Sequence, residues 1–279
     1  IEGIVRVQST AGIAQNGVLD QGYAPLFENY ASQGYQRIVA VGDIEPRSSA
    51  GIDLTVEIRE LLGDQHPTLV GGSAASYADS QFGIERALPW AAGWVLLATL
   101  LLLFLFTGSV ILPIKAVLLN VLSLGATLGF VTWVFAEGHL QSVIGEFSVT
   151  GTIDTSSTVL IAVIAFGLSM DYELFLLSRI KEQHDAGSST IDSVALGLQR
   201  SGRIITAAAL VLAVTFIAFV SSGISIMKML GLGIAFAIIL DATVVRGLLV
   251  PALMRLFGDL NWWAPKWMKR IYRKLGLTH

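Results

Sequence analysis

The first third of the chain mixes short apolar stretches with polar and turn-forming residues. Residues 36–44 form a short β-rich run, and 45–49 supply the turn and start of a helix that reaches Gly63. A strand is predicted at 68–70 and a helix at 74–87, and residues 4–7 and 25–35 suggest another strand and helix. The pattern therefore predicts a small α+β domain over residues 1–88.

After Pro89 the pattern changes to long apolar runs. Five of them are each long enough to cross a hydrocarbon core of about 30 Å. They are residues 90–106, 114–135, 158–177, 204–220 and 229–249. Soluble cores rarely use so many apolar runs of this length. We therefore predict a five-helix transmembrane domain over residues 89–257, followed by a basic, amphipathic cytoplasmic tail over residues 258–279.

Composition agrees with a membrane protein and narrows the chemistry. The chain is 53% hydrophobic and 14% charged, whereas soluble domains have about 25% charged residues. It has no Cys, so disulfides and thiolate metal sites are excluded, and its four His are scattered without metal-site spacing. It carries no GxGxxG or P-loop pattern. We expect no metal, no cofactor, no nucleotide and no nucleic-acid partner.

The positions of Lys and Arg predict the orientation. Basic residues gather between the third and fourth runs and after the fifth, which places both segments in the cytoplasm. They are Arg179, Lys181, Arg200, Arg203, Lys266, Lys269, Arg270, Arg273 and Lys274. Residues 136–157 contain acidic residues but no Lys or Arg, as expected on the opposite side. With five spans, the N-terminal domain should then be extracytoplasmic.

The third run contains the most informative residues. Asp171 and Glu173, with Tyr172 between them, interrupt an apolar helix. A carboxylate at the centre of a membrane helix costs about 2.5–3.5 kcal/mol on insertion scales, so it should face protein or water and have a role. Gly167 and Asp171 belong to a small, polar helix face that should pack against a partner helix.

Two roles for these residues follow from their chemistry. The Asp171 carboxyl and the Tyr172 hydroxyl could load and release a proton, or Asp171 could only join two helices by hydrogen bonds. Glu173 lies nearer the cytoplasmic end and fits either relay support or a solvated anchor. In the fifth run, Asp241 shares a small-residue face and is predicted to serve the polar core. Arg246 could pair with a carboxylate or act as a cytoplasmic anchor.

Three ordered segments carry a family resemblance. They are FGLSMDYELFLLSRI at 166–180, SGRIITAAAL at 201–210 and LDATVVRGLLVPALMRLFGDLNWWAPKW at 240–267. Together they resemble the C-terminal half of MmpL-type transporters of the RND superfamily. The resemblance implies an α-helical membrane protein built from two repeats, of which this chain matches the second porter subdomain, a small α+β extracytoplasmic domain, and the last five helices. We expect the chain to be one half of a longer protein.

The resemblance also implies a function. Asp171 and Tyr172 would form a proton relay with a matching Asp-Tyr pair in the first repeat, supported by Asp241 and Arg246. The implied activity is export of lipids or lipid conjugates, driven by the proton-motive force, from the bacterial inner membrane toward the cell envelope. The partners would be a lipidic or amphipathic substrate, the membrane and the N-terminal repeat, while assembly into a homo-oligomer stays open.

Other functions fit less well. A drug or siderophore exporter could share the fold, because fold does not determine substrate. The two intramembrane aspartates could suggest an aspartyl protease, but the order Asp171-Tyr172, preceded by Met170, differs from the Tyr-Asp and Gly-x-Gly-Asp orders of those enzymes. A sterol-sensing or scaffold relative would carry no proton-coupled flux. The sequence thus favours a secondary active transporter, not an enzyme.

Overall fold

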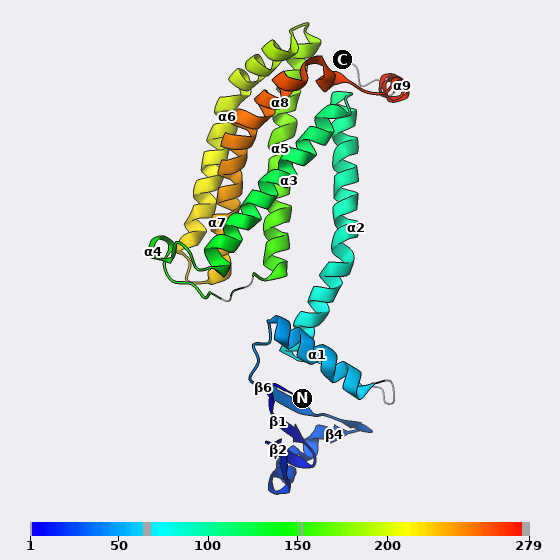
Figure 1. The fold of residues 1–279 in the computed structure, drawn as a ribbon, viewed down its shortest axis with the longest axis vertical. Helices are drawn as coiled ribbons and strands as arrows, with labels where there is room; N and C mark the ends of the chain where they lie inside the picture. Colours follow the sequence, from blue (N-terminus) through cyan, green and yellow to red (C-terminus); the bar gives the residue numbers. More distant parts are fainter. Residues whose placement is uncertain (1, 64–67, 150, 152, 275–279) are drawn as a thin grey trace. The chain divides into compact units, whose positions relative to one another are not determined.

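The computed structural model describes residues 2–63, 68–149, 151 and 153–274. The chain divides into two compact units, unit 1 (Ile1–Pro89) and unit 2 (Trp90–His279), shown in Figure 1. A small sheet lies in unit 1, and long apolar helices make up unit 2. This combination confirms the predicted fold class.

Unit 1 begins with a four-stranded antiparallel sheet in the order β3-β2-β1-β6. Its strands are β1 (Ile4–Ser9), β2 (Gly12–Gln15), β3 (Val18–Asp20) and β6 (Val39–Gly42). Asn16 and Gly17 join β2 to β3 with φ angles of 50° and 79°. An Asn-Gly pair adopts this left-handed backbone easily, so it sets the hairpin and its register.

The remaining elements of unit 1 match the predictions unevenly. Helix α1 (Ser49–Leu62) begins where expected, because the Ser48 side chain caps it by accepting a hydrogen bond from the Gly51 N–H at 3.2 Å. The helix expected at 25–35 is instead a 3-10 helix, η1 (Gln21–Tyr30), that contains Pro25. A hairpin of β4 (Ala31–Ser32) and β5 (Tyr35–Gln36) follows it.

Around the end of unit 1, one prediction was wrong and another is confirmed with different bounds. Residues 68–70 form no strand; Leu69 is 99% exposed and belongs to neither sheet of the described residues. A strand needs a neighbouring strand for its backbone groups. The helix at 74–87 and the first apolar run are not separate, because both lie in one helix, α2 (Ser73–Thr107), which continues through Pro89. Proline removes one N–H from a helix, and apolar helices accommodate that loss locally.

Unit 2 contains five helices that are long and apolar enough to cross a membrane, which confirms the five predicted runs. They are α2, α3 (Ile111–Val131) with η2 (Thr132–Ala136), α5 (Thr155–Asp185), α6 (Thr190–Ala218) with η3 (Phe219–Ser221), and α7 (Ser225–Leu240) with its continuations. The continuations are η4 (Asp241–Leu249) and α8 (Val250–Phe257). Shorter elements are α4 (Gln141–Ile144), η5 (Gly258–Trp262) and α9 (Lys266–Lys274).

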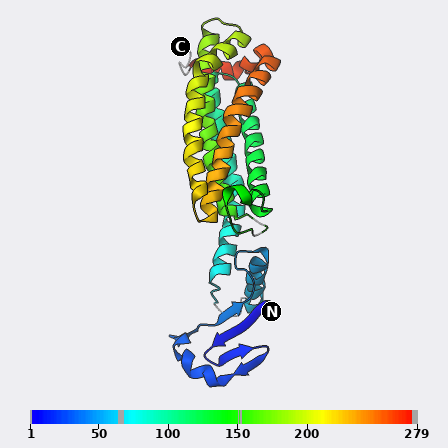
Figure 2. The ribbon, with the colours of Figure 1, turned by 90° about the vertical axis from the view of Figure 1, so that its left-hand side faces the viewer.

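Helices α3, α5, α6 and α7 pack into one bundle, as Figures 1 and 2 show from two sides. Helix α5 lies against α6, and α7 contacts α3, α5 and α6. Glycines permit two of these approaches: a Cβ on Gly197 of α6 would lie 2.7 Å from a carbon of Ile180, and one on Gly231 of α7 would lie 2.5 Å from the Phe216 carbonyl oxygen. Small residues therefore set the helix spacing, as in other membrane bundles.

A buried lysine fastens the loop between α3 and α5. Lys228 of α7 is 7% exposed, and its ammonium donates hydrogen bonds to the carbonyl oxygens of Ile144 at 2.8 Å and Glu146 at 3.1 Å. This loop holds the acidic, Lys- and Arg-free segment 136–157 used above to predict orientation. A lysine next to this segment is an exception to the Lys and Arg asymmetry from which the orientation is predicted, and its hydrogen bonds give it a structural reason to be there.

We predict that Lys228→Met loosens this loop. The variant leaves two carbonyl groups without their charged donor, and a hydrogen bond to a charged group contributes about 1.5–3 kcal/mol. We expect a clear fall in melting temperature in detergent and faster protease cleavage within residues 137–149. Arg179→Met, which removes an exposed ion pair with Glu182 and a cation–π contact with Phe175, lies far from this loop in sequence and should change neither. Unchanged cleavage in Lys228→Met would show that the loop is held by other contacts.

Candidate functional site: a buried charge network

The site begins with an irregular stretch of the fifth span. Residues of η4 form π-helical turns, in which hydrogen bonds join residues five apart. Asp241 and Arg246 are five apart, and η4 brings their side chains into contact. In a regular α-helix with 3.6 residues per turn they would point roughly 140° apart. The π-helical backbone therefore allows one helix to supply both members of an ion pair.

The ion pair is almost completely buried. Asp241 is 5% exposed and Arg246 is 2% exposed, and the Arg246 Nη2 contacts the Asp241 Oδ2. Helix α5 completes the hydrogen bonding through Ser169: its hydroxyl donates to the Asp241 Oδ1 at 2.9 Å, and its carbonyl accepts from the Arg246 Nη2 at 2.5 Å. Opposite charges in an apolar interior are tolerated when they are paired and further hydrogen bonds of this kind satisfy them.

Two further residues of α5 reach the same centre. The Glu173 Oε2 lies 4.0 Å from the Arg246 Nε, and Glu173 is 6% exposed. The guanidinium carbon of Arg246 lies 5.0 Å from the centre of the Tyr172 ring, within cation–π range. Tyr172 and Glu173 follow Ser169 by three and four residues, which places all three side chains on one side of α5. We call these five residues the charge network.

Asp171 does not join the charge network. It is exposed in unit 2, as is Gly167 one turn earlier, whereas Tyr172 is partly buried against Arg246. At Gly167 and Asp171 the predicted small, polar face of α5 therefore meets no partner helix within the described part of this chain, although Leu174 of the same face packs against the core. The adjacent residues Asp171 and Tyr172 thus have different surroundings: one faces outward and the other faces the buried arginine.

Four of the five predicted site residues are brought together, namely Tyr172, Glu173, Asp241 and Arg246. Their placement bears on the alternatives left open for two of them. Arg246 pairs with a carboxylate and is no solvated anchor, and Glu173 is likewise buried. Sequence reasoning missed Ser169, Lys115 and Lys228. Ser169 gave no signal, because single hydroxyls are common in membrane helices. Both lysines could have been found, because the cost that singles out a carboxylate in an apolar run applies equally to a buried ammonium.

Two small cavities flank the charge network, each of about 10 Å³. One is lined by Ser169, Tyr172, Asp241 and Arg246 together with apolar side chains. The other is lined by Glu173 and Lys115 among apolar residues. A volume of this size holds about one water molecule, provided polar groups surround it. The Arg246 Nε has no hydrogen-bond partner among the described residues, so water is a suitable ligand for it.

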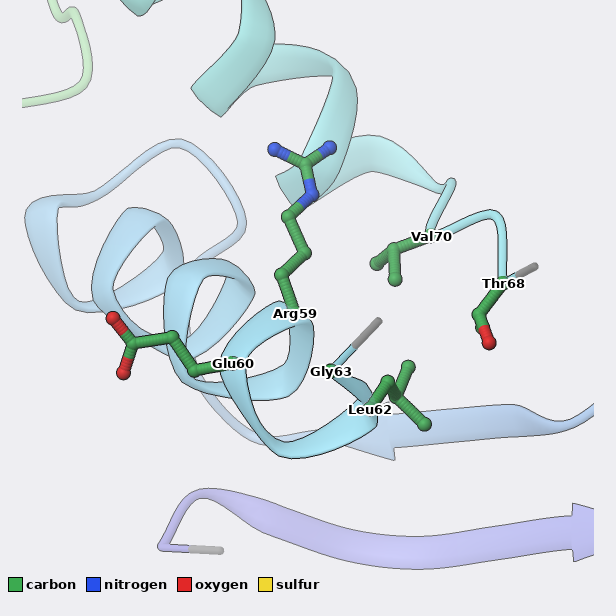
Figure 3. A pocket seen from close by; sticks show the side chains of 6 residues that line it. All are labelled: Arg59, Glu60, Leu62, Gly63, Thr68 and Val70. Atoms are coloured by element: carbon green, nitrogen blue, oxygen red, sulfur yellow. The ribbon is translucent and has the colours of Figure 1, made fainter. Parts of the chain in front are cut away.

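Unit 1 has a larger hollow of about 460 Å³ at the end of α1, shown in Figure 3. Arg59 and Glu60 extend in different directions at its edge. Arg59 makes two hydrogen bonds to the Asp79 carboxylate, at 2.7 and 3.0 Å, which raise the pKa of Arg59 above its ordinary value. In the described residues no group of His, Asp and Glu side chains is arranged to hold a metal ion. The charge network is therefore the candidate site.

The described residues form five apolar spans that enclose the charge network. They define a multi-pass membrane protein whose interior contains paired charged side chains. The MMPL family matches residues 41–277, and the chain belongs to this family.

Curated relatives agree with the family match. The chain is 47% identical over 228 residues to a membrane protein of Streptomyces coelicolor, covering 82% of the chain and 32% of that protein. It is 44% identical over 243 residues to the trehalose monomycolate exporter MmpL3 of Mycobacterium tuberculosis, covering 86% and 25%. It is 38% identical over 236 residues to the mycolic acid-containing lipids exporter MmpL11 of Mycolicibacterium smegmatis, covering 83% and 24%. The chain thus spans about a quarter to a third of their length.

We predict that Asp241 and Arg246 stabilise the bundle only as a pair. Removing one partner leaves an unpaired buried charge, which destabilises by about 3–5 kcal/mol, whereas removing both does not. Asp241→Leu and Arg246→Met should each lower the folded yield and the melting temperature in detergent. The double variant should recover most of both losses, because the two residues are directly coupled. Additive losses in the double variant would show that each residue stabilises the bundle separately.

Proposed function

We propose that this chain is one half of a proton-driven exporter of lipids or lipid conjugates. The charge network carries the proposal, because buried ionisable residues in membrane helices mark proton pathways, and this set lies next to a further intramembrane carboxylate at Asp171. The names of two relatives, a trehalose monomycolate exporter and a mycolic acid-containing lipids exporter, support a lipidic substrate. They favour it over the drug and siderophore alternative. They also support transport over proteolysis.

Asp171 is the proposed proton carrier. It is the exposed carboxylate within the apolar part of α5, and no partner for it lies among the described residues. An exposed carboxylate inside a bilayer is costly, so a further polar surface should cover it in the whole protein. A first repeat with its own Asp-Tyr pair would supply that surface and place a second carboxylate near the first. Two such carboxylates could share and pass on one proton.

Tyr172 would connect the proposed carrier to the charge network. Its ring lies against the Arg246 guanidinium, and Arg246 also contacts the Asp241 carboxylate. A change of charge at Asp171 would therefore alter the field at Tyr172, and through it the position of Arg246. The network holds α5 against η4, so protonation and helix position become coupled. Coupling of this kind is what a transporter needs to link proton flow to a conformational change.

The proposed orientation places the N-terminal unit and the loop between α3 and α5 outside, with the α5–α6 connection and the C-terminal tail inside. The orientation rests on the asymmetry of Lys and Arg. We predict that, in intact cells, a membrane-impermeant maleimide labels Ser142→Cys but reaches Ser188→Cys only after permeabilisation. Labelling of Ser188→Cys alone in intact cells would reverse the orientation.

We predict that Asp171→Asn abolishes proton-driven export while leaving the fold intact. Asparagine keeps the size and hydrogen bonding of aspartate but cannot ionise, so it separates a proton carrier from a residue that only joins helices. The measurement is movement of trehalose monomycolate across proteoliposomes that contain the full-length protein, under an imposed pH gradient. The expected loss is at least a hundredfold, and Asp171→Glu should retain partial activity.

Asp185→Asn is the matched control, because it makes the same change on the same helix in an exposed ion pair with Lys181. Its flux should equal that of the wild type. Near-normal flux in Asp171→Asn would make Asp171 a structural residue. Wild-type flux that does not respond to the pH gradient would contradict proton coupling altogether and would leave a non-transporting scaffold as the better assignment.

A further inference from the structure

A second lysine is buried near the charge network, at the start of α3. Lys115 is 9% exposed and its ammonium donates a hydrogen bond to the Asn261 Oδ1. Its Nζ also lies 5.3 Å from the centre of the Phe257 ring. On its other side Lys115 lines the small cavity that Glu173 also lines. The lysine therefore stands between a polar segment at the end of the bundle and a buried carboxylate.

Asn261 holds Lys115 in a rigid setting. Asn261 is 0% exposed, and its amide nitrogen donates to the carbonyl oxygens of Met254 at 2.7 Å and Gly258 at 2.5 Å. The backbone carbonyl oxygen of Asn261 accepts a hydrogen bond from the Ser109 hydroxyl at 2.5 Å. These contacts fix the amide so that its side-chain oxygen points at the lysine. The ammonium is thus positioned by the chain before any proton or substrate arrives.

Charge balance gives Lys115 a reason to be buried. Asp241 and Glu173 are two buried acids, and Arg246 alone contacts both. The Arg246 Nη2 contacts the Asp241 Oδ2 closely, whereas the Glu173 Oε2 lies 4.0 Å from the Arg246 Nε. Lys115 adds a second positive group, which lines the same small cavity as Glu173. Two acids and two bases then have no net charge, which lowers the cost of burying the set in a membrane.

We propose that Lys115 is the counter-ion of Glu173 and a positioning residue for it, and that this second charge pair takes part in proton-coupled transport. The groups that face Glu173 are Arg246 and Asp241 from η4 and Lys115 from α3. When Glu173 is neutralised, Lys115 keeps its contacts with Asn261 and Phe257 but loses its electrostatic attraction to α5. Protonation of Glu173 would thereby loosen the packing of α3 against α5. This inference rests on the proposed function.

The test separates structural pairing from a role in transport by combining single and paired neutral variants. Full-length protein is prepared as wild type, Lys115→Met, Lys115→Gln, Lys115→Arg, Glu173→Gln and the double variant Lys115→Met with Glu173→Gln. Melting temperature is measured in detergent. Proton entry, followed with a pH-sensitive dye, and movement of trehalose monomycolate are measured in proteoliposomes. Lys181→Met, in a partly exposed pair with Asp185, is the control and should match the wild type in every assay.

We expect Lys115→Met and Glu173→Gln each to lower the melting temperature and to reduce both fluxes at least tenfold. The double variant should recover the melting temperature but not the fluxes. Lys115→Gln, which keeps a donor for Asn261 without the charge, should lose flux as Lys115→Met does, and Lys115→Arg should keep at least half of it. These results would distinguish the charge of Lys115 from its hydrogen bond.

Other results would overturn the proposal. Recovery of both fluxes in the double variant would show that the pair only stabilises the fold. Normal fluxes in Lys115→Met at normal protein levels would show that Glu173 needs no second counter-ion. A wild-type protein without gradient-dependent flux would contradict the proposed function instead, and the melting temperatures would still report whether the two residues form a charge pair.

Discussion

The buried ion pair between Asp241 and Arg246 is the contact on which the polar centre of unit 2 depends. Both residues come from one helix, and the π-helical backbone of η4 brings them together. The pair also binds α5, through the hydroxyl and the backbone carbonyl oxygen of Ser169. Glu173 and Tyr172 of the same helix lie close to the arginine. An unpaired charge at this depth would destabilise the bundle, so the arginine fixes how α5 and η4 pack.

Most of the fold can be predicted from the sequence, because apolar runs of membrane length are a strong signal. The five spans and the small α+β unit follow from pattern alone. The contact between Asp241 and Arg246 cannot be predicted in this way, because a five-residue spacing places them on different sides of a regular helix. The local sequence gives no signal for π-helical turns. The absence of a strand at 68–70 could not be foreseen, because strand pairing depends on distant residues that a local pattern cannot reveal. Lys115 is not singled out by the asymmetry of Lys and Arg along the chain, because that asymmetry indicates only orientation.

Two carboxylates within the apolar part of α5 have different surroundings. Glu173 is buried near Arg246 and lines the same cavity as Lys115, whereas Asp171 faces outward and meets no partner in the described residues. Tyr172 lies between them in sequence and against Arg246 in space. Under the proposed function, a change of charge at Asp171 on the outer face of α5 would alter the field at the charge network on its inner face. The same proposal makes proton movement depend on a first repeat that covers Asp171.

The central claim is that Asp171, on the outer face of α5, is the group that gains and loses the proton. Difference infrared spectroscopy of the full-length protein in lipid tests it directly, because a protonated carboxyl has a C=O stretching band that a carboxylate lacks. A pH titration should reveal such a band, and we expect it to vanish in Asp171→Asn and to persist in Asp241→Asn. A band unchanged in Asp171→Asn and lost in Asp241→Asn would place the proton inside the charge network and contradict the assignment.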